Sequence, residues 1–221
     1  MPPSFRHTAA LALMLACAAA PGSTRAQSPA AAPAAAPAAT APMNSAPSFI
    51  VEMVGRAYGA ARDPALSPPA RREKLQALVR QDFDLPAIAR AVLGSHWRGA
   101  SEADRAQFTA AFADYMVALY APQMASYGGR PLTVTGQRAE SDVTIVSTTI
   151  SQANGAPPVG VDWRMVKAAD SYRVTDVVVE RVSLMQTKRE EIGAVLARSG
   201  GGLGGLTAQL RDRTTQAAAD R

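Results

Sequence analysis

Cysteine and histidine are nearly absent from this chain, which holds one cysteine and two histidines among 221 residues. Cys17 lies in an N-terminal segment that we expect to be removed, and His96 is the only histidine after it. A zinc site built from cysteine and histidine needs three or four such ligands, and a Cys-His nucleophile pair needs one of each. The mature chain therefore lacks the residues for either kind of site.

Residues 1–26 are predicted to be a signal peptide, so we expect export. Arg6 precedes an apolar run, residues 9–20, that is too short for a transmembrane anchor. Cleavage after Ala26 would start the mature chain at Gln27, and cleavage after Ala20 is the alternative. Cys17 also permits anchoring as a lipoprotein, but Met14 and Leu15 fit that processing pattern poorly. A domain of about 165 residues buries close to 70% of its unfolded surface, so it needs no disulfides.

Residues 27–47 are rich in alanine and proline, with prolines at 29, 33, 37, 42 and 47. Prolines at this spacing interrupt the helix that alanines favour, so we expect a disordered linker. It is either a spacer from a membrane or partner, or a low-complexity leader without a role. The folded domain is expected over 48–214, followed by a flexible tail over 215–221.

Strand signals dominate residues 141–180. Three segments rich in β-branched residues are separated by the turns ANGAPP and AAD, and they follow a first expected strand over 131–137. Helical periodicity precedes and follows them, with predicted caps at Ser48, Asp84, Ser101 and Ser183, and Pro122 expected to bend or end the longest helix. The order predicts an α+β fold, in which a four-stranded antiparallel meander sheet is covered by N- and C-terminal helices.

The distribution of charge and the expected export exclude a nucleic-acid partner. Removing Arg6 and Arg25 with the leader leaves 21 basic and 18 acidic residues, a net charge of +3. The arginines are scattered and form no basic stripe, and nucleic acid is no partner for an exported protein. This mildly basic surface is compatible with brief contact with anionic lipid head groups.

Each candidate for catalysis has a simpler structural explanation. His96 would have to serve any serine hydrolase, but it lies in GSHWRG and the chain has no G-x-S-x-G segment. Asp82 with Asp84 and Glu190 with Glu191 are explained by helix capping and a polar helix face. Gly200, Gly202 and Gly205 match G-x-G-x-x-G but follow a helix, whereas a dinucleotide site follows a strand. We therefore expect no enzyme, no metal and no cofactor.

A resemblance to a known family extends over almost all of residues 48–210. It is carried by Phe83-Asp84-Leu85, the helix from Ser101 to Tyr120, Asn154-Gly155, VGVDWRMVK, Asp176-Val177 and the run that begins VSLMQTKREEIG. In this order they resemble the toluene-tolerance, or MlaC-like, family of exported phospholipid-binding proteins. Arg181 departs from the glycine of the family's E-G-V-S segment, so we expect the geometry of that turn to differ from the family's.

The resemblance implies a periplasmic carrier in the Mla pathway, which maintains outer-membrane lipid asymmetry. Its partners would be phospholipid as cargo, an outer-membrane lipoprotein-porin complex, and an inner-membrane ABC transporter with its lipid-binding subunit. We expect a monomer. A hopanoid-associated branch of the same family is an alternative, although Met185-Gln186-Thr187-Lys188 is closer to the phospholipid branch. A lipid-free exported adaptor and an unusual hydrolase remain alternatives from other classes.

The expected cargo site is an apolar cavity between the sheet and the helices. For each lining position, ordinary core packing is the competing interpretation, and a continuous apolar cavity would distinguish the two. The predicted lining residues are Phe112, Met116, Tyr120, Val146, Thr148, Ile150, Val161, Trp163, Met165, Val177, Val179 and Leu184.

Overall fold

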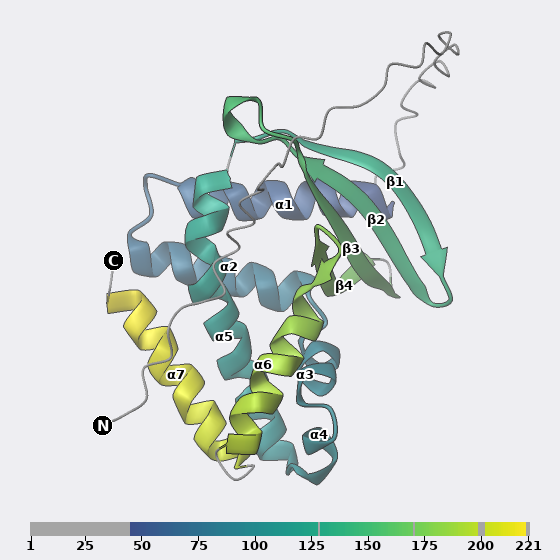
Figure 1. Cartoon of the computed structure of the whole chain (residues 1–221). Coiled ribbons are helices and arrows are strands. Elements are labelled where there is room, and N and C mark those ends of the chain that lie inside the picture. The colour runs from purple at the N-terminus through teal and green to yellow at the C-terminus, as the bar shows by residue number, and fades with distance from the viewer. Residues whose placement is uncertain (1–44, 128, 170, 199–201, 220–221) are drawn as a thin grey trace, which may run out of the picture. The chain divides into compact units, whose positions relative to one another are not determined.

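Five antiparallel strands form one sheet in the order in which they follow along the chain (Figure 1). The expected meander is confirmed, and a short fifth strand extends the four that we predicted. β1 runs to Glu140, beyond the predicted Gln137. The strands are β1 Leu132–Glu140, β2 Val143–Ile150, β3 Val159–Ala168, β4 Ser171–Val179 and β5 Val182–Ser183.

The computed structural model describes residues 45–219 except 128, 170 and 199–201. The predicted signal peptide and most of the predicted linker lie outside the described residues. The helices are α1 Ala46–Arg62, α2 Pro68–Asp82, α3 Leu85–Leu93, α4 His96–Gly99, α5 Glu102–Tyr127, α6 Leu184–Arg198 and α7 Leu203–Ala219, with a 3₁₀ turn, Ala153–Gly155, between β2 and β3.

Three of the four predicted helix caps are present. Asp84 Oδ1 accepts a hydrogen bond from the Ala87 N–H at 3.1 Å, Ser101 Oγ accepts from Asp104 at 3.1 Å, and Ser183 Oγ accepts from Gln186 at 3.0 Å. The prediction for the first helix was wrong by one turn. Its cap is Ser45, whose Oγ accepts from the Ser48 N–H at 3.3 Å, because Ala46 and Pro47 already form the first turn.

Two helices are longer than the sequence predicted. α5 continues through Pro122 to Tyr127, because its last turns pack Met124 and Ala125 against the buried cluster among α1, α2 and α5, and this packing offsets the hydrogen bond that proline removes. α7 extends to Ala219 instead of ending near Thr214. The sequence also gave no sign of α4, the single turn that contains His96.

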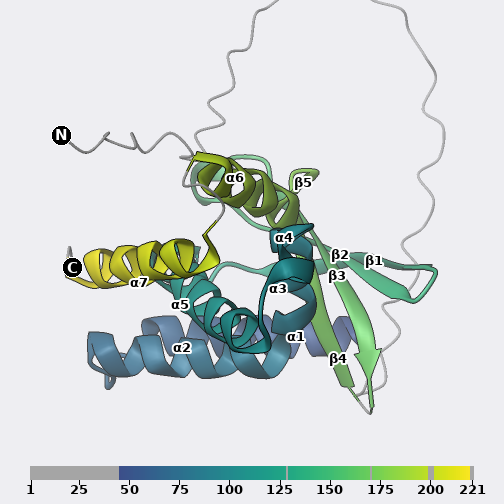
Figure 2. The same ribbon diagram turned by 90° about the horizontal axis from the view of Figure 1, so that it is seen from below.

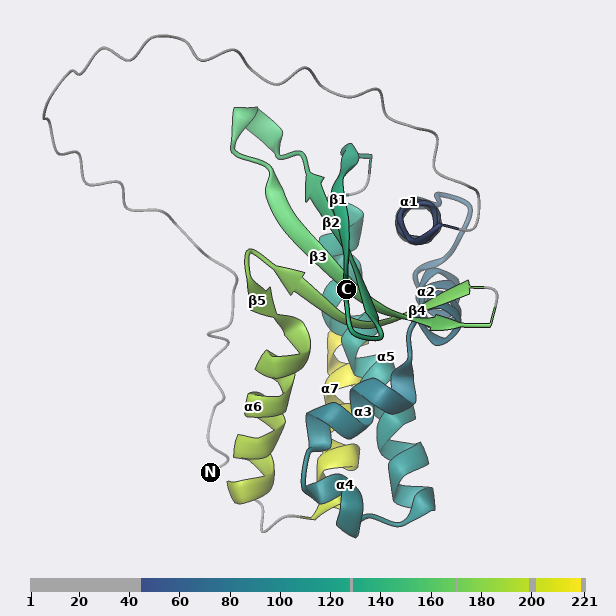
Figure 3. The same cartoon turned by 90° about the vertical axis from the view of Figure 1, so that its right-hand side faces the viewer.

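The helices cover the sheet unequally. α1 lies along one face and contacts β1, β2 and β4, while α3 and α6 meet the sheet at β4 (Figure 3). α5 packs mainly against α7, and α2 lies beside α1 (Figure 2). As a result, the longest helix belongs to a helical layer and has little direct contact with the sheet.

Buried apolar side chains gather in three clusters. The sheet cluster joins α1 to β2, β3 and β4 and includes Ile50, Val146, Met165 and Val174. The helical cluster joins α3, α5, α6 and α7, and a third cluster lies among α1, α2 and α5. Three separate cores are therefore present, one between α1 and the sheet and two among the helices.

Candidate functional site

The predicted lining residues of β2, β3 and β4 form two rows across one face of the sheet. In the first row Val146 lies opposite Trp163, which lies opposite Val177. In the second row Thr148 lies opposite Val161, which lies opposite Val179. Since side chains alternate between the faces of a strand, the period-2 pattern correctly predicted this shared face.

The first row is packed beneath α1. Val146 is fully buried in the sheet cluster, as is Met165, and Trp163 and Val177 pack against that cluster. The α1 side of this contact consists of Ala46, Ile50, Met53 and Val54. These four predicted lining residues therefore act here as core residues that hold α1 to the sheet.

The residues of the second row lie outside the three clusters of buried side chains. Thr148 and Val161 are 2% and 5% exposed, but neither belongs to any of the three clusters, and Val179 is half-buried. Ile150, at the end of β2, and Leu184, at the start of α6, are also half-buried and outside the clusters. This row, Ile150 and Leu184 are therefore the predicted lining residues of the sheet and of α6 that lie outside the three clusters.

The polar atoms on this face satisfy one another. The Trp163 indole N–H donates to Thr148 Oγ1 at 3.0 Å, and the Thr148 hydroxyl donates to the Val161 carbonyl oxygen at 3.0 Å. A buried polar group without a partner is costly, so this chain of hydrogen bonds allows two polar side chains to lie among valines. The face therefore offers a hydrocarbon surface although it contains a threonine and a tryptophan.

The predicted lining residues of α5 lie elsewhere. Phe112 is buried in the helical cluster and stacks on Phe108, with ring centroids 5.6 Å apart, and Met116 packs against the same cluster. The helical periodicity correctly marked these side chains as interior. It gave no information on which element they face, and they pack against α3, α6 and α7 instead of the sheet.

Tyr120 has a polar environment that the sequence did not reveal. Burial raises the pKa of the Tyr120 phenol, Glu191 and Tyr115 add to the rise, and Lys188 opposes it. The Lys188 side chain is only 7% exposed, and its Nζ lies 2.8 Å from Glu191 Oε2. Lysine at one position of a helix gives no signal of burial, so sequence reasoning missed this group.

The carboxylates considered for catalysis have structural partners. Asp82 is paired with Arg56, Asp84 caps α3, Glu190 accepts from Gln186, and Glu191 pairs with Lys188. His96 is exposed on α4. Within the described residues, no group of three or more His, Cys, Asp or Glu side chains is placed to hold a metal ion. None of the helices in the same residues has the length and hydrophobicity that a membrane-spanning helix requires.

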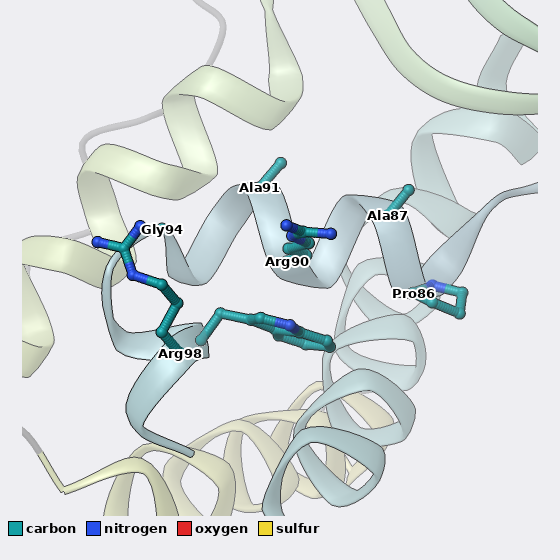
Figure 4. Close-up of a pocket in the computed structure, with 7 residues that line it drawn as sticks. Pro86, Ala87, Arg90, Ala91, Gly94 and Arg98 are labelled. Carbon is teal, nitrogen blue, oxygen red and sulfur yellow. The ribbon is translucent and has the colours of Figure 1, made fainter. Parts of the chain in front are cut away.

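A groove with basic rims lies on the outer side of α3 (Figure 4). Its volume is about 590 Å³, and Ala87 and Ala91 line it together with Trp97. In Figure 4, Arg90 lies between the two alanines, and Arg98 reaches toward Gly94. We call this hollow the α3 groove. It was not predicted from the sequence, because its two walls come from separate helices.

Comparisons with known proteins place the chain in a family. The family model described as MlaC protein matches residues 54–212, which is more than half of the chain. The intermembrane phospholipid transport system binding protein MlaC of Haemophilus influenzae is 23% identical over 134 residues, covering 57% of this chain. The match spans 63% of that relative's length, less than two thirds.

A solved structure shows the same fold. It is that of a phospholipid-binding protein from Ralstonia solanacearum in complex with a phospholipid, with a TM-score of 0.65 and 24% sequence identity. The match covers 77% of this chain and 97% of that one. The family match and this likeness in fold agree with the resemblance seen in the sequence, and the chain belongs to the MlaC protein family.

Proposed function

We propose that this protein is a periplasmic phospholipid carrier that maintains outer-membrane lipid asymmetry. It would move lipid between an outer-membrane lipoprotein-porin complex and an inner-membrane ABC transporter with its lipid-binding subunit. The observation that carries the proposal is the family match over residues 54–212. The name of the Haemophilus relative and the lipid in the Ralstonia protein support the same function.

A carrier of this kind needs an apolar enclosure and no covalent chemistry. Each buried methylene is worth about 0.8 kcal/mol, so two acyl chains exposed to water cost on the order of 20 kcal/mol. An apolar sheet face whose polar atoms are already hydrogen-bonded would accept such chains without leaving a polar group unpaired. The sheet face that Thr148, Val161 and Val179 form has these properties, because it is apolar and its polar atoms are hydrogen-bonded to each other.

The proposed acyl-chain surface is the second row and its neighbours Ile150 and Leu184. The first row and the neighbouring Met165 are already covered by α1. Acyl chains would reach it only if α1 separates from the sheet. Phe112, Met116 and Tyr120 would meet the lipid only from the helical side, so we propose a smaller role for them.

Native mass spectrometry of the protein exported to a bacterial periplasm tests the proposal. We expect one stoichiometric adduct with the mass of a phospholipid, and extraction followed by lipid identification should give its class. A hopanoid adduct would instead place the protein in the hopanoid-associated branch. A protein that is purified empty, and stays empty after mixing with liposomes, would contradict the carrier function and favour an adaptor.

A further inference from the structure

The α3 groove carries an excess of positive charge. Arg90 and Arg98 are exposed, and neither side chain forms an ion pair within the described part of the chain. The Arg189 guanidinium lies close to Gly94, with its Nη2 3.1 Å from the point where a Cβ would stand. No acidic residue lines the groove. Unbalanced arginines around a hollow favour a ligand that brings carboxylates or phosphates.

The floor of the groove is small and rigid. Ala87, Ala91 and Gly94 follow one another at intervals of four and three residues, so they lie on one side of α3 and its C-terminal cap. The opposite side of α3 is fixed in the helical cluster through Val92 and Leu93. A floor without large side chains allows the backbone of another chain to approach closely.

Trp97 gives the groove an apolar wall and a free donor. The Arg105 guanidinium carbon lies 5.2 Å from the centre of the Trp97 ring, and Arg105 Nε donates to the Trp97 carbonyl oxygen at 3.0 Å. These contacts fix the tryptophan in place. Its indole N–H donates to no acceptor among the described residues. Fixed aromatic side chains beside arginines are typical of the centres of protein interfaces.

A second hollow continues the groove. It has a volume of about 530 Å³ and shares Pro86 and Trp97 with the first. Glu102 lines this second hollow, while its Arg80 is paired with Asp114. The excess positive charge is therefore concentrated in the first hollow, and an extended ligand could follow both.

We propose that the α3 groove binds an acidic segment of a protein partner in lipid transfer. Carboxylates of the segment would pair with Arg90 and Arg98, and an apolar side chain would lie on the alanines beside Trp97. A flat bilayer surface fits a hollow poorly, and the exposed large apolar side chains, Val51 and Val182, lie on α1 and β5. This inference rests on the proposed carrier function.

Site-specific photo-crosslinking in cells tests the proposal. We would replace Ala91 with p-benzoylphenylalanine, and use Ala77, which is exposed on α2, as the matched control position. We expect a covalent adduct from position 91 whose crosslinked peptide, identified by mass spectrometry, is rich in Asp and Glu. No such adduct should form from position 77. A lipid adduct, a peptide without acidic residues, or no adduct at all would overturn the proposal.

Charge-reversal variants provide a second test of the docking proposal. Arg90→Glu with Arg98→Glu should reduce the yield of the adduct about tenfold, because like charges now face each other. Arg72→Glu with Arg181→Glu changes the net charge equally outside the groove and should leave the yield unchanged. An unchanged yield in the first variant, or an equal loss in both, would overturn the proposal.

Lipid content separates this inference from the proposed function. Native mass spectrometry of the same variants should show unchanged phospholipid occupancy, because the groove lies outside the proposed acyl-chain surface. If the chain carries lipid but no acidic partner peptide is captured, the docking proposal fails and the carrier function stands. If the unmodified protein carries no lipid, the carrier function fails.

Discussion

The indole N–H of Trp163 donates a hydrogen bond of 3.0 Å to the hydroxyl of Thr148 on the neighbouring strand. The same hydroxyl donates to the Val161 carbonyl oxygen, so one side chain serves both as acceptor and as donor. The two residues lie diagonally across β2 and β3, since Thr148 is directly opposite Val161. Their contact keeps an apolar sheet face free of unpaired polar atoms.

Replacing Thr148 tests this contact. Thr148→Val keeps the shape but leaves the indole N–H without its acceptor, so we expect a loss of about 1–2 kcal/mol in the free energy of unfolding. Thr148→Ser keeps the hydroxyl and is the control, with a smaller loss. Urea unfolding followed by circular dichroism measures both. No loss in Thr148→Val would contradict a contribution of the hydrogen bonds to stability, and a larger loss in Thr148→Ser than in Thr148→Val would show that packing of the methyl group matters more.

Two valines on the same face should respond differently to enlargement. Val161→Phe adds volume in the row outside the packed clusters, so we expect lower phospholipid occupancy with little change in melting temperature. Val146→Phe adds volume beneath α1 and should cost about 1–3 kcal/mol of stability through overpacking. Native mass spectrometry and thermal unfolding give the two readouts. Full occupancy in folded Val161→Phe would remove this row from the proposed lipid surface.

The ion pair between Arg56 and Asp82 should contribute more to the free energy of unfolding than the more exposed pair between Arg80 and Asp114. Arg56 Nη2 lies 3.0 Å from both carboxylate oxygens of Asp82, whose side chain is 3% exposed. Arg56→Ala would leave a buried carboxylate without its partner, and we expect a loss of about 2 kcal/mol. Arg80→Ala breaks the more exposed pair with Asp114 and should cost less than about 1 kcal/mol. Chemical unfolding of both variants decides whether burial sets the difference.

Alkaline pH should destabilise the protein partly through Tyr120. Burial raises the pKa of its phenol above the ordinary 10.0, so the folded state holds this proton more tightly than the unfolded state. The contribution to stability is complete below pH 10 and is lost as the pH rises through the pKa of the folded state.

Unfolding in urea at about pH 8 and about pH 11 measures this loss. Tyr120→Phe should show a smaller fall in stability between the two conditions than the unmodified protein. Tyr172→Phe, in which the tyrosine of β4 is replaced, should show the full fall. Identical behaviour of the two variants would contradict the assignment to Tyr120.

The turn between β4 and β5 has a residue that is poorly suited to its backbone. Arg181 has a φ of 68°, in the left-handed region that favours glycine, and glycine is what the family resemblance led us to expect there. Arg181→Gly should therefore raise the free energy of unfolding by roughly 1 kcal/mol.

Glu180 is the matched control for this turn. Its φ of 47° is also left-handed, but its carboxylate accepts a hydrogen bond from the Gly160 N–H, which Glu180→Gly would remove. We expect little or no gain in thermal stability from that variant. No gain from Arg181→Gly would show that the left-handed conformation of Arg181 does not limit the stability of this turn.

The sequence by itself determined much of the local structure. Cap residues such as Asp84 and Ser183 identified where helices begin, and alternating β-branched residues identified the face that Val146 and Val161 share. These features depend on neighbours along the chain or on a fixed two-residue period, so sequence carries them directly.

Only the tertiary structure decided what each buried face meets. Phe112 and Trp163 were predicted to face one cavity, yet Phe112 belongs to the helical cluster and Trp163 packs against the sheet cluster. α5 continues past Pro122 and Lys188 is buried because packing joins segments that are distant in the chain, whereas Arg90 and Arg98 flank one groove because the consecutive helices α3 and α4 pack together. The spacing of apolar residues in one segment predicts which side chains are buried. It does not predict which other segment they pack against.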